Sequence, residues 1–272
     1  MVFRTPRRLS ALSAWSAPGR FAFTVGGGRG VLVQAALNGG TTRAEHPAVP
    51  LTPAELAADA LAAAGQGAQA LHLHPRDAAG AQTLDPDHVL AAVAAVRAAT
   101  GLPVGVTTGI WTVDGDVARR LRLVARWTGP DRPDYASINM NEPGTDDLAD
   151  LLTSLGIEIE AGVWTPEDAR LLAAAAFSDR ILRVLMEPVD RNPAGAVTTA
   201  AEAAAELARL GVTARQAHHG YDLATWDVMG AAVAMGRDIR VGLEDTTFLP
   251  DGSVARGNAD LVAAAVRLVR GS

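Results

Sequence analysis

The feature that most constrains the fold of this chain is a unit of one short apolar run followed by one helix-like segment, which occurs eight times. Most of the apolar runs are continuous rather than alternating, as in strands buried on both faces of a parallel sheet. Several helix-like segments begin with a capping residue and a proline, as in Thr52-Pro53 and Asp85-Pro86. Eight such units in 272 residues predict the α/β class and a single-domain (β/α)8 TIM barrel, rather than an open doubly wound sheet.

The limits of these units follow from the apolar runs and the capping residues. The expected strands lie at about 31–37, 68–74, 103–109, 134–140, 157–162, 180–188, 212–220 and 238–245. The expected helices cover about 51–65, 85–101, 113–126, 145–155, 165–176, 198–211, 223–236 and 258–270. The glycine-rich segment 26–30 precedes a strand instead of joining a strand to a helix, which indicates a turn rather than a dinucleotide-binding loop. We expect residues 1–22 to be a disordered extension and residues 23–272 to form the barrel domain.

Charge and hydropathy argue against several classes of protein. The chain has a formal net charge of -6 and no arginine-dense patch with interleaved aromatic residues, which argues against a nucleic-acid partner. No apolar run approaches the roughly 18 residues of a membrane span. The basic N-terminal segment lacks the continuous apolar core of an export signal. We therefore expect a cytoplasmic protein that binds neither nucleic acid nor membranes.

Two residue types are missing from the sequence. There is no cysteine, and all 24 basic residues are arginine, so there is no lysine. The first absence excludes disulfides, thiolate nucleophiles and cysteine-ligated metals. The second excludes Schiff-base chemistry, which needs a lysine amine. Any carbon–carbon chemistry in this chain therefore requires a metal or a general base to stabilise an enolate.

Polar residues stand at the carboxyl ends of nearly all the predicted strands, which is where TIM barrels carry their active sites. Buried polar groups are costly unless they are satisfied, so packing alone explains this pattern poorly. In chain order these residues are Asn38, His72, His74, Thr107, Thr108, Gly109, Asn139, Glu142, Glu160, Glu187, His218, His219, Glu244 and Asp245. The pattern indicates an enzyme.

His72 and His74 are separated by one residue on the second predicted strand, so their side chains share a face. Taken alone, the pair is better explained as one packed histidine and one that hydrogen bonds a neighbour. In a barrel, however, a third ligand is available from another strand end, namely Glu244. Two histidines and one carboxylate leave a coordination position for substrate, which is the arrangement of a catalytic zinc.

Glu244 and Asp245 follow the eighth predicted strand. Neighbours within a strand face opposite sides, but where the backbone turns at the strand end both can reach the site. We assign Glu244 as a ligand and Asp245 as a base; the alternative is a polar loop that caps the last helix. Arg240 pairs with a substrate carboxylate or keeps Asp245 ionised, with a structural salt bridge as the alternative.

Further candidates follow the middle strands. Thr107, Thr108 and Gly109 offer hydroxyl and N–H groups suited to a substrate carboxylate, although an ordinary turn explains them equally well. Asn139 and Glu142 are candidates for substrate binding after the fourth strand.

The fifth and seventh strands add acidic and histidine candidates. Glu160 shares a strand face with Glu158, which is unusual in a buried strand and suggests a function for Glu160. His218 and His219 are candidates for a ligand or a cosubstrate contact, and at least one of them fits a supporting position better.

The segments HLHPRD, PVGVTTG, DYASINMNE, IEIEAG and RVGLED, in this order, resemble the β-keto acid cleavage enzymes. That family includes the 3-keto-5-aminohexanoate cleavage enzymes of lysine fermentation. The similarity covers roughly residues 31–270, and the spaced pair HLHPRD and VGLED is its most specific part.

The resemblance implies a (β/α)8 barrel, commonly a homotetramer, with Zn²⁺ held by His72, His74 and Glu244. It implies an acyltransferase reaction in which a β-keto acid and acetyl-CoA give acetoacetate and a new acyl-CoA. It further implies that Asp245, assisted by Arg240, takes the substrate proton while zinc polarises the keto oxygen.

The same resemblance assigns the substrate carboxylate to Thr107 and Gly109, and places Glu160 near Asp245 and the substrate tail. One departure is Thr41, which stands where some members carry a glutamate that approaches the metal. This difference bears on the fourth coordination position and on the substrate class.

Two alternatives to this function remain at the level of the sequence. One is a zinc-dependent TIM-barrel hydrolase, although such hydrolases often carry the histidine pair after the first strand and use a metal-bridging lysine. The other is a non-catalytic metal-binding barrel that senses a small acid, which turnover with acetyl-CoA would distinguish.

Overall fold

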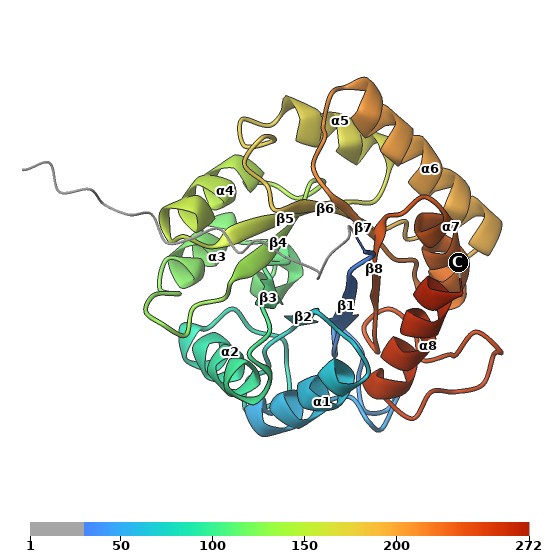
Figure 1. Cartoon of the computed structure of the whole chain (residues 1–272). Coiled ribbons are helices and arrows are strands. Elements are labelled where there is room, and N and C mark those ends of the chain that lie inside the picture. The colour runs from blue at the N-terminus through green and yellow to red at the C-terminus, as the bar shows by residue number, and fades with distance from the viewer. Residues whose placement is uncertain (1–29, 272) are drawn as a thin grey trace, which may run out of the picture. The chain divides into compact units, whose positions relative to one another are not determined.

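The structure is a computed structural model that describes residues 30–271, and these residues form a closed barrel of eight parallel strands in chain order (Figure 1). The predicted α/β TIM barrel is thus confirmed. The strands are β1 (Val33–Ala36), β2 (Ala70–Leu73), β3 (Val104–Thr107), β4 (Tyr135–Asn139), β5 (Glu158–Val163), β6 (Arg183–Met186), β7 (Gln216–His218) and β8 (Asp238–Val241). The predictions for residues 1–22 and for the glycine-rich turn up to residue 29 lie outside the described residues.

One α-helix follows each strand and packs on the outside of the barrel (Figure 1). The α-helices are α1 (Pro53–Gly65), α2 (Pro86–Thr100), α3 (Val117–Val124), α4 (Thr145–Ser154), α5 (Pro166–Ala174), α6 (Pro193–Arg209), α7 (Thr225–Ala234) and α8 (Asn258–Arg270). Two 3-10 helices, η1 (Ile110–Val113) and η2 (Asp222–Ala224), lie in the loops after β3 and β7.

The capping residues begin the helices as the sequence indicates. The Thr52 hydroxyl accepts a hydrogen bond from the Glu55 N–H, and the Glu55 carboxylate accepts one from the Thr52 N–H, which forms a capping box. Gly101 ends α2 with a φ of 65°, a left-handed conformation that glycine adopts without a steric penalty. These local signals fix where each helix leaves its strand.

Several elements are shorter than predicted or begin elsewhere, and three of them show the physical reason. The segment predicted as one helix over 113–126 contains η1, then Asp114 at a φ of 55°, and a shorter α3 that is capped by Asp116. Helix α6 begins at Pro193 rather than at residue 198, because Asn192 accepts a hydrogen bond from the Gly195 N–H and caps it earlier. Strand β7 is limited to Gln216–His218, since only these residues pair with β6.

The two faces of the strands carry different chemistry. Leu71 and Leu73 of β2 are buried in the apolar core between the sheet and the helices. His72, which lies between them, interacts electrostatically with Glu160 of β5 and Arg240 of β8. Residues of non-adjacent strands can meet only across the barrel interior, so the interior of this barrel is polar.

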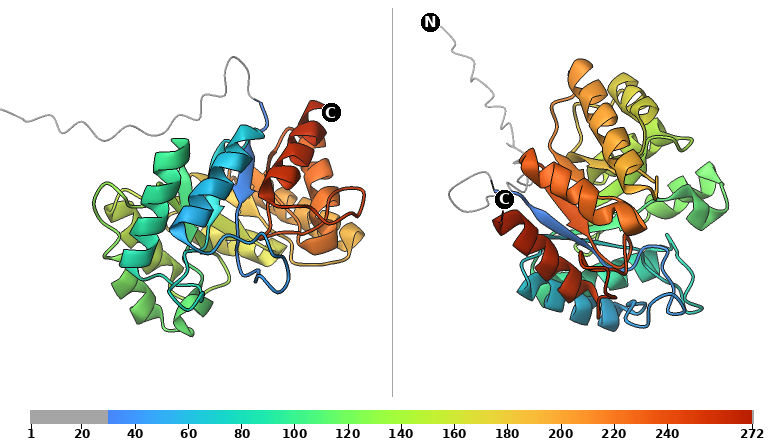
Figure 2. Two further views of the ribbon diagram at one scale, coloured as in Figure 1. Left: turned by 90° about the horizontal axis from the view of Figure 1, so that it is seen from below. Right: turned by 90° about the vertical axis from the view of Figure 1, so that its right-hand side faces the viewer.

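The loops that follow β1 and β8 lie side by side at one end of the barrel (Figure 2). The Thr41 hydroxyl donates to the Leu243 carbonyl over 2.7 Å, and His46 Nε2 lies 2.8 Å from the Ala255 carbonyl oxygen. Within residues 30–271, no helix combines the length and apolar character needed to cross a bilayer.

Candidate active site

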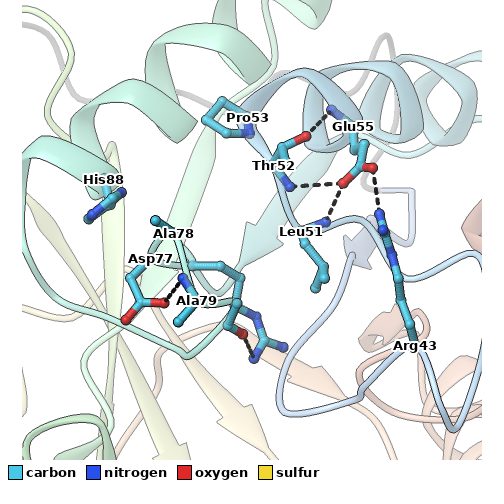
Figure 3. Close-up of a pocket in the computed structure, with 11 residues that line it drawn as sticks. Arg43, Leu51, Thr52, Pro53, Glu55, Asp77, Ala78, Ala79 and His88 are labelled. Carbon is cyan, nitrogen blue, oxygen red and sulfur yellow. Dashed lines mark hydrogen bonds and ion pairs between the residues drawn. The ribbon is translucent and has the colours of Figure 1, made fainter.

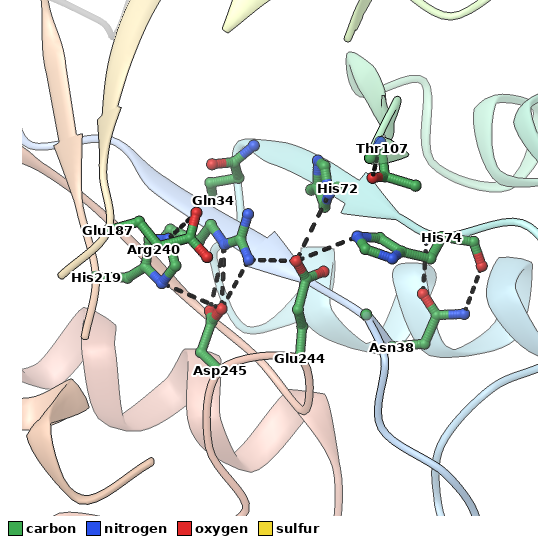
Figure 4. Close-up of polar contacts among 12 residues, drawn as sticks. Gln34, Asn38, His72, His74, Thr107, Glu187, His219, Arg240, Glu244 and Asp245 are labelled. Atoms are coloured by element: carbon green, nitrogen blue, oxygen red, sulfur yellow. Dashed lines mark hydrogen bonds and ion pairs between the residues drawn. The ribbon is translucent and has the colours of Figure 1, made fainter. Parts of the chain in front are cut away.

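His72, His74 and Glu244 converge at the carboxyl ends of β2 and β8 (Figure 4). Each offers one ligand atom, and these three atoms lie within 4.8 Å of one another. Oε1 of Glu244 is 3.3 Å from Nε2 of His74 and 3.7 Å from Nε2 of His72. The structure therefore brings together the three residues that the sequence analysis named as metal ligands.

The backbone around the first two strands fixes this cluster. The Asn38 side chain accepts a hydrogen bond from the His74 N–H over 2.8 Å and donates to the His74 carbonyl over 2.9 Å. Gly39 has a φ of 48°, and a Cβ at this position would lie 2.2 Å from Cγ of Glu244. Glycine at residue 39 thus leaves the space in which the Glu244 carboxylate reaches the histidines.

The donor set and its electrostatics fit a metal ion. Burial lowers the pKa of His72 to about 4, so its imidazole is neutral and keeps a lone pair for a ligand. Oε2 of Glu244 is buried, and no hydrogen-bond partner is found for it among the described residues. Two imidazoles and one carboxylate are a donor set that Zn²⁺ takes in catalytic sites.

Glu160 and Arg183 form an ion pair beside His72 in the barrel interior. Arg183 Nε donates to Oε1 of the fully buried Glu160 over 2.6 Å. Oε2 of Glu160 lies 4.0 Å from Nδ1 of His72. Burial alone would raise the pKa of Glu160, but the guanidinium of Arg183, with that of Arg240, holds it below its ordinary value.

Arg240 and Asp245 form a second cluster beside the first. Arg240 Nη2 donates to Oδ1 of Asp245 over 2.8 Å and also to Oε1 of Glu244. Burial alone would raise the pKa of Asp245, but Arg240 and His219 hold it below its ordinary value. Asp245 is therefore ionised, and Arg240 joins it to the metal cluster.

His219 completes this second cluster (Figure 4). Its Nδ1 lies 3.2 Å from Oδ1 of Asp245, and its Nε2 lies 3.5 Å from Oε2 of Glu187. Burial and Arg240 lower the pKa of His219, but Asp245 and Glu187 raise it to about 9. His219 is therefore protonated and lies between two carboxylates.

The candidates after β3 and β4 make contacts within their own loops. Thr107 Oγ1 accepts a hydrogen bond from the Gly109 N–H over 3.0 Å, and the Thr108 hydroxyl donates to the Ser137 carbonyl. Oε1 of Glu142 accepts from Asn139 Nδ2 over 2.8 Å.

The other oxygen of Glu142 is also engaged. Oε2 accepts from the Ile110 N–H over 3.1 Å and from the guanidinium of the buried Arg120. Glu142 therefore holds the loop after β3 against the loop after β4, and its substrate-binding role stays a prediction.

Several residues with contacts to the site are absent from the sequence-based candidates. Gln82 Oε1 is 2.6 Å from Nδ1 of His74, and the ring of Trp111 stacks on His74 with centroids 6.3 Å apart. Arg183 is the partner of Glu160. The turn signals Asp77 and Gly80 are the available hint, since they predict a reversal of the chain between His74 and Gln82.

A cavity of about 360 Å³ lies against that reversal, whose residues 76–80 line it (Figure 3). It is lined by residues of the loops after β1 and β2 and of the starts of α1 and α2, among them Arg43, Glu55, Asp77 and His88. Arg43 pairs with Glu55, and Asp77 accepts from the Ala79 N–H over 2.9 Å. Neither the histidine pair nor Glu244 lines this cavity, so the candidate site is the cluster in Figure 4.

The sequence model of the β-keto acid cleavage enzymes matches residues 30–272, which is nearly the whole chain. The chain belongs to the β-keto acid cleavage enzyme family. The family predicted from the short motifs is confirmed. The chain is also similar to a 3-keto-5-aminohexanoate cleavage enzyme of Fusobacterium nucleatum, with 25% identity over 267 residues that cover 88% of this chain and 91% of that protein.

Solved structures of low sequence identity share the fold. Apo ObcA superposes with a TM-score of 0.69 at 19% identity, over 83% of this chain and 63% of that one. The chain thus spans less than two thirds of the length of ObcA. ObcA has also been solved with oxaloacetate, and with a C4-CoA adduct and oxalate. A 3-dehydroquinate dehydratase from Aquifex aeolicus has a TM-score of 0.54 at 13% identity, over 89% of this chain and 98% of that one.

Proposed function

We propose that this chain is a zinc-dependent β-keto acid cleavage enzyme that uses acetyl-CoA and releases acetoacetate and a new acyl-CoA. The observation that carries the proposal is the convergence of His72, His74 and Glu244 directly beside the Arg240–Asp245 pair, in a chain of this family. One cluster offers metal ligands, and the other offers an ionised carboxylate.

Zn²⁺ held by His72, His74 and Glu244 would act as a Lewis acid toward the keto group of the substrate. The ligands that the chain supplies leave room for a substrate at such a centre. Neutral imidazoles are needed for this role, and the low pKa of His72 favours that form.

Asp245 is the base in this proposal. It takes a proton from the substrate carbon between the keto and carboxylate groups, where the resulting negative charge is delocalised. Arg240 keeps Asp245 ionised before the transfer, and His219 holds one of its oxygens. A base that is already charged and fixed in place needs no rearrangement before it acts.

The atom balance of the reaction is simple. The deprotonated carbon joins the acetyl carbon of acetyl-CoA, and its bond to the keto carbon of the substrate breaks. The CoA sulfur leaves the acetyl carbon and joins that keto carbon, and the proton held by Asp245 returns to the carbon from which the keto carbon was cleaved. The two-carbon unit that carries the carboxylate therefore leaves as part of acetoacetate, which makes the enzyme an acyltransferase.

Thr107 and Gly109 are proposed to bind the substrate carboxylate, with Thr108, Asn139 and Glu142 as neighbouring contributors. Both Thr107 and Thr108 are buried at the end of β3. The ObcA structure that holds a C4-CoA adduct and oxalate supports a CoA-linked substrate for this chain. The homotetramer and the cytoplasmic location stay predictions.

The experiment that tests the proposal is a panel of β-keto acids with acetyl-CoA, run with purified protein before and after zinc chelation. We expect formation of acetoacetate and a new CoA ester with at least one acid, lost on chelation and restored by Zn²⁺. Absence of zinc from the purified protein, together with no turnover across the panel, would overturn the proposal.

A further inference from the structure

The loop after β2 returns the chain to His74 by a short reversal. Arg76 and Gln82 form an antiparallel bridge, and the Asp77 N–H donates to the Ala81 carbonyl over 2.9 Å. Oδ1 of Asp77 accepts from the Ala79 and Ala81 N–H groups, each over 2.9 Å. Gly80, at a φ of 83°, supplies the left-handed residue that the turn needs.

Two groups converge on one oxygen at the end of this reversal. Oε1 of Gln82 lies 2.6 Å from Nδ1 of His74 and 3.1 Å from Nε1 of Trp111. The indole N–H can only donate a hydrogen bond. The amide atom that faces Trp111 must therefore be the oxygen, which removes the usual ambiguity of a glutamine side chain.

The orientation of Gln82 then fixes the proton on His74. An amide oxygen only accepts, so Nδ1 of His74 must be the N–H donor in this contact. The lone pair of the neutral ring is then on Nε2, which is the nitrogen 3.3 Å from Glu244. This is the tautomer that a ligand through Nε2 requires.

Trp111 is placed to maintain this arrangement. Its side chain is one of the large apolar groups that stay exposed, at 46%. Its ring nevertheless lies over Gly109, where a Cβ would be 2.2 Å from the ring, and stacks on His74 at 26°. A glycine at residue 109 and a single hydrogen bond to Gln82 thus hold an exposed indole against the candidate ligand.

We propose that Gln82 is a positioning residue that fixes His74 in the Nδ1–H tautomer, and that Trp111 locks the amide of Gln82 in the required orientation. The inference rests on the proposed function, because it concerns the metal ligand His74. Partners of this kind typically change metal affinity by 10- to 100-fold when they are removed.

The first test is the tautomer of His74 in metal-free protein, read from its ring ¹⁵N shifts at a pH where the ring is neutral. We expect the Nδ1–H form in the wild type and in Gln82→Glu, whose carboxylate also accepts from both donors. Gln82→Leu removes the acceptor, so the proton should move toward Nε2, which faces Glu244.

The second test is Zn²⁺ affinity, measured by competition with a chromophoric chelator. Gln82→Leu should weaken binding by about 10- to 100-fold, whereas Gln82→Glu should stay within about 3-fold of the wild type. Trp111→Phe should weaken binding by about 3- to 10-fold, since the amide is then free to turn.

The matched control variants remove a glutamine–histidine contact and a tryptophan hydrogen bond that do not involve His74. Gln216 Oε1 lies 3.0 Å from Nε2 of His218, and Trp226 Nε1 donates to the Phe248 carbonyl over 2.8 Å. Gln216→Leu and Trp226→Phe should leave both the His74 tautomer and the Zn²⁺ affinity unchanged.

A Gln82→Leu protein that keeps the Nδ1–H tautomer and wild-type Zn²⁺ affinity would overturn the inference. If Gln82→Leu does not fold, the Trp111→Phe variant tests the inference instead. An unchanged Zn²⁺ affinity of this variant would contradict the proposal that Trp111 locks the amide of Gln82. A wild-type protein that binds no Zn²⁺ refutes the proposed function, while the metal-free ¹⁵N shifts still decide the tautomer.

Discussion

His72 and His219 are both buried at the same end of the barrel, yet their pKa values shift in opposite directions. Burial lowers the pKa of His72 to about 4. Burial acts on His219 in the same direction, but Asp245 and Glu187 raise its pKa to about 9. The two histidines mark two regions, a metal cluster with neutral donors and a base cluster with paired charges.

The difference lies in how much negative charge each histidine receives. Near His72, the carboxylate of Glu160 is engaged by Arg183 and that of Glu244 by Arg240. His219 lies between Asp245 and Glu187, with only Arg240 opposing them among the groups that shift its pKa. The placement of two arginines, Arg183 and Arg240, among the carboxylates thus maintains a neutral imidazole and a charged imidazole at the same end of the barrel.

The largest effect is expected when a ligand of the metal cluster is removed, because the base cluster then acts without a metal. His72→Ala should abolish stoichiometric Zn²⁺ binding and reduce CoA-ester formation by more than about 1,000-fold, because the Lewis acid is lost. Metal content is measured by mass spectrometry on the purified protein. His88→Ala, at a half-buried histidine away from the cluster, should keep both zinc and activity. Retained turnover in His72→Ala would contradict the role of the metal cluster.

A change confined to the base cluster should separate chemistry from metal binding. Asp245→Asn removes the proposed base and should lower kcat by about 100- to 10,000-fold. Zinc content should stay stoichiometric, because the ligand set is intact. The exposed Asp87→Asn on α2 is the matched control. Loss of zinc from Asp245→Asn would show that the two clusters are one functional unit rather than two.

The positions of the ligands were predictable because strand periodicity fixes them. His72 and His74 share a face by their spacing, and both Glu244 and Asp245 reach the site because the backbone turns after β8. These predictions need only the order of the strands and the closure of the barrel. Residue spacing together with the closed barrel was sufficient to predict that the ligands of β2 and β8 come together.

The supporting residues were not predictable in the same way. Gln82 reaches His74 only because a reversal of a few residues returns the chain, and the direction of that return depends on Asp77 and Gly80. Arg183 is one arginine among 24, and its contact with Glu160 depends on the register of β5 against β6. Contacts of this kind are set by tertiary geometry rather than by local pattern.

The raised pKa of His219 predicts a pH-dependent contribution to stability. Between its ordinary value of 6.5 and about 9, the folded protein binds more protons at His219 than the unfolded chain does. The free energy of unfolding therefore falls as pH rises through this window, by about 3 kcal/mol from this residue.

The comparison with His219→Gln isolates this contribution. Urea unfolding of the metal-free proteins at pH 6.5 and pH 9 should show a larger loss for the wild type than for the variant. Equal losses in the two proteins would mean that His219 is not held in its charged form, and the contrast with His72 would disappear.

The smallest expected effect concerns Asp59 of α1, a carboxyl group for which residues 30–271 provide no ion-pair partner. Burial raises the pKa of Asp59 to about 6, and the hydrogen bond from Asn258 Nδ2 over 2.6 Å offsets this only in part. The pKa of Asp245, which is buried beside Arg240, is lowered instead. A neutral amide therefore does not replace a guanidinium as the partner of a buried carboxylate.

The sign of the Asp59 effect follows from proton binding. Between pH 3.8 and about 6 the folded protein binds more protons at Asp59 than the unfolded chain does, so stability falls as pH rises. Allowing for its partial exposure, this loss should be about 2 kcal/mol. Asp59→Asn should remove it, since asparagine can still accept from Asn258, while the exposed Asp87→Asn should retain it. Urea unfolding at pH 4 and pH 6.5 measures the difference, and a wild-type pH dependence that persists in Asp59→Asn would show that solvent, rather than burial, sets the charge of this carboxyl.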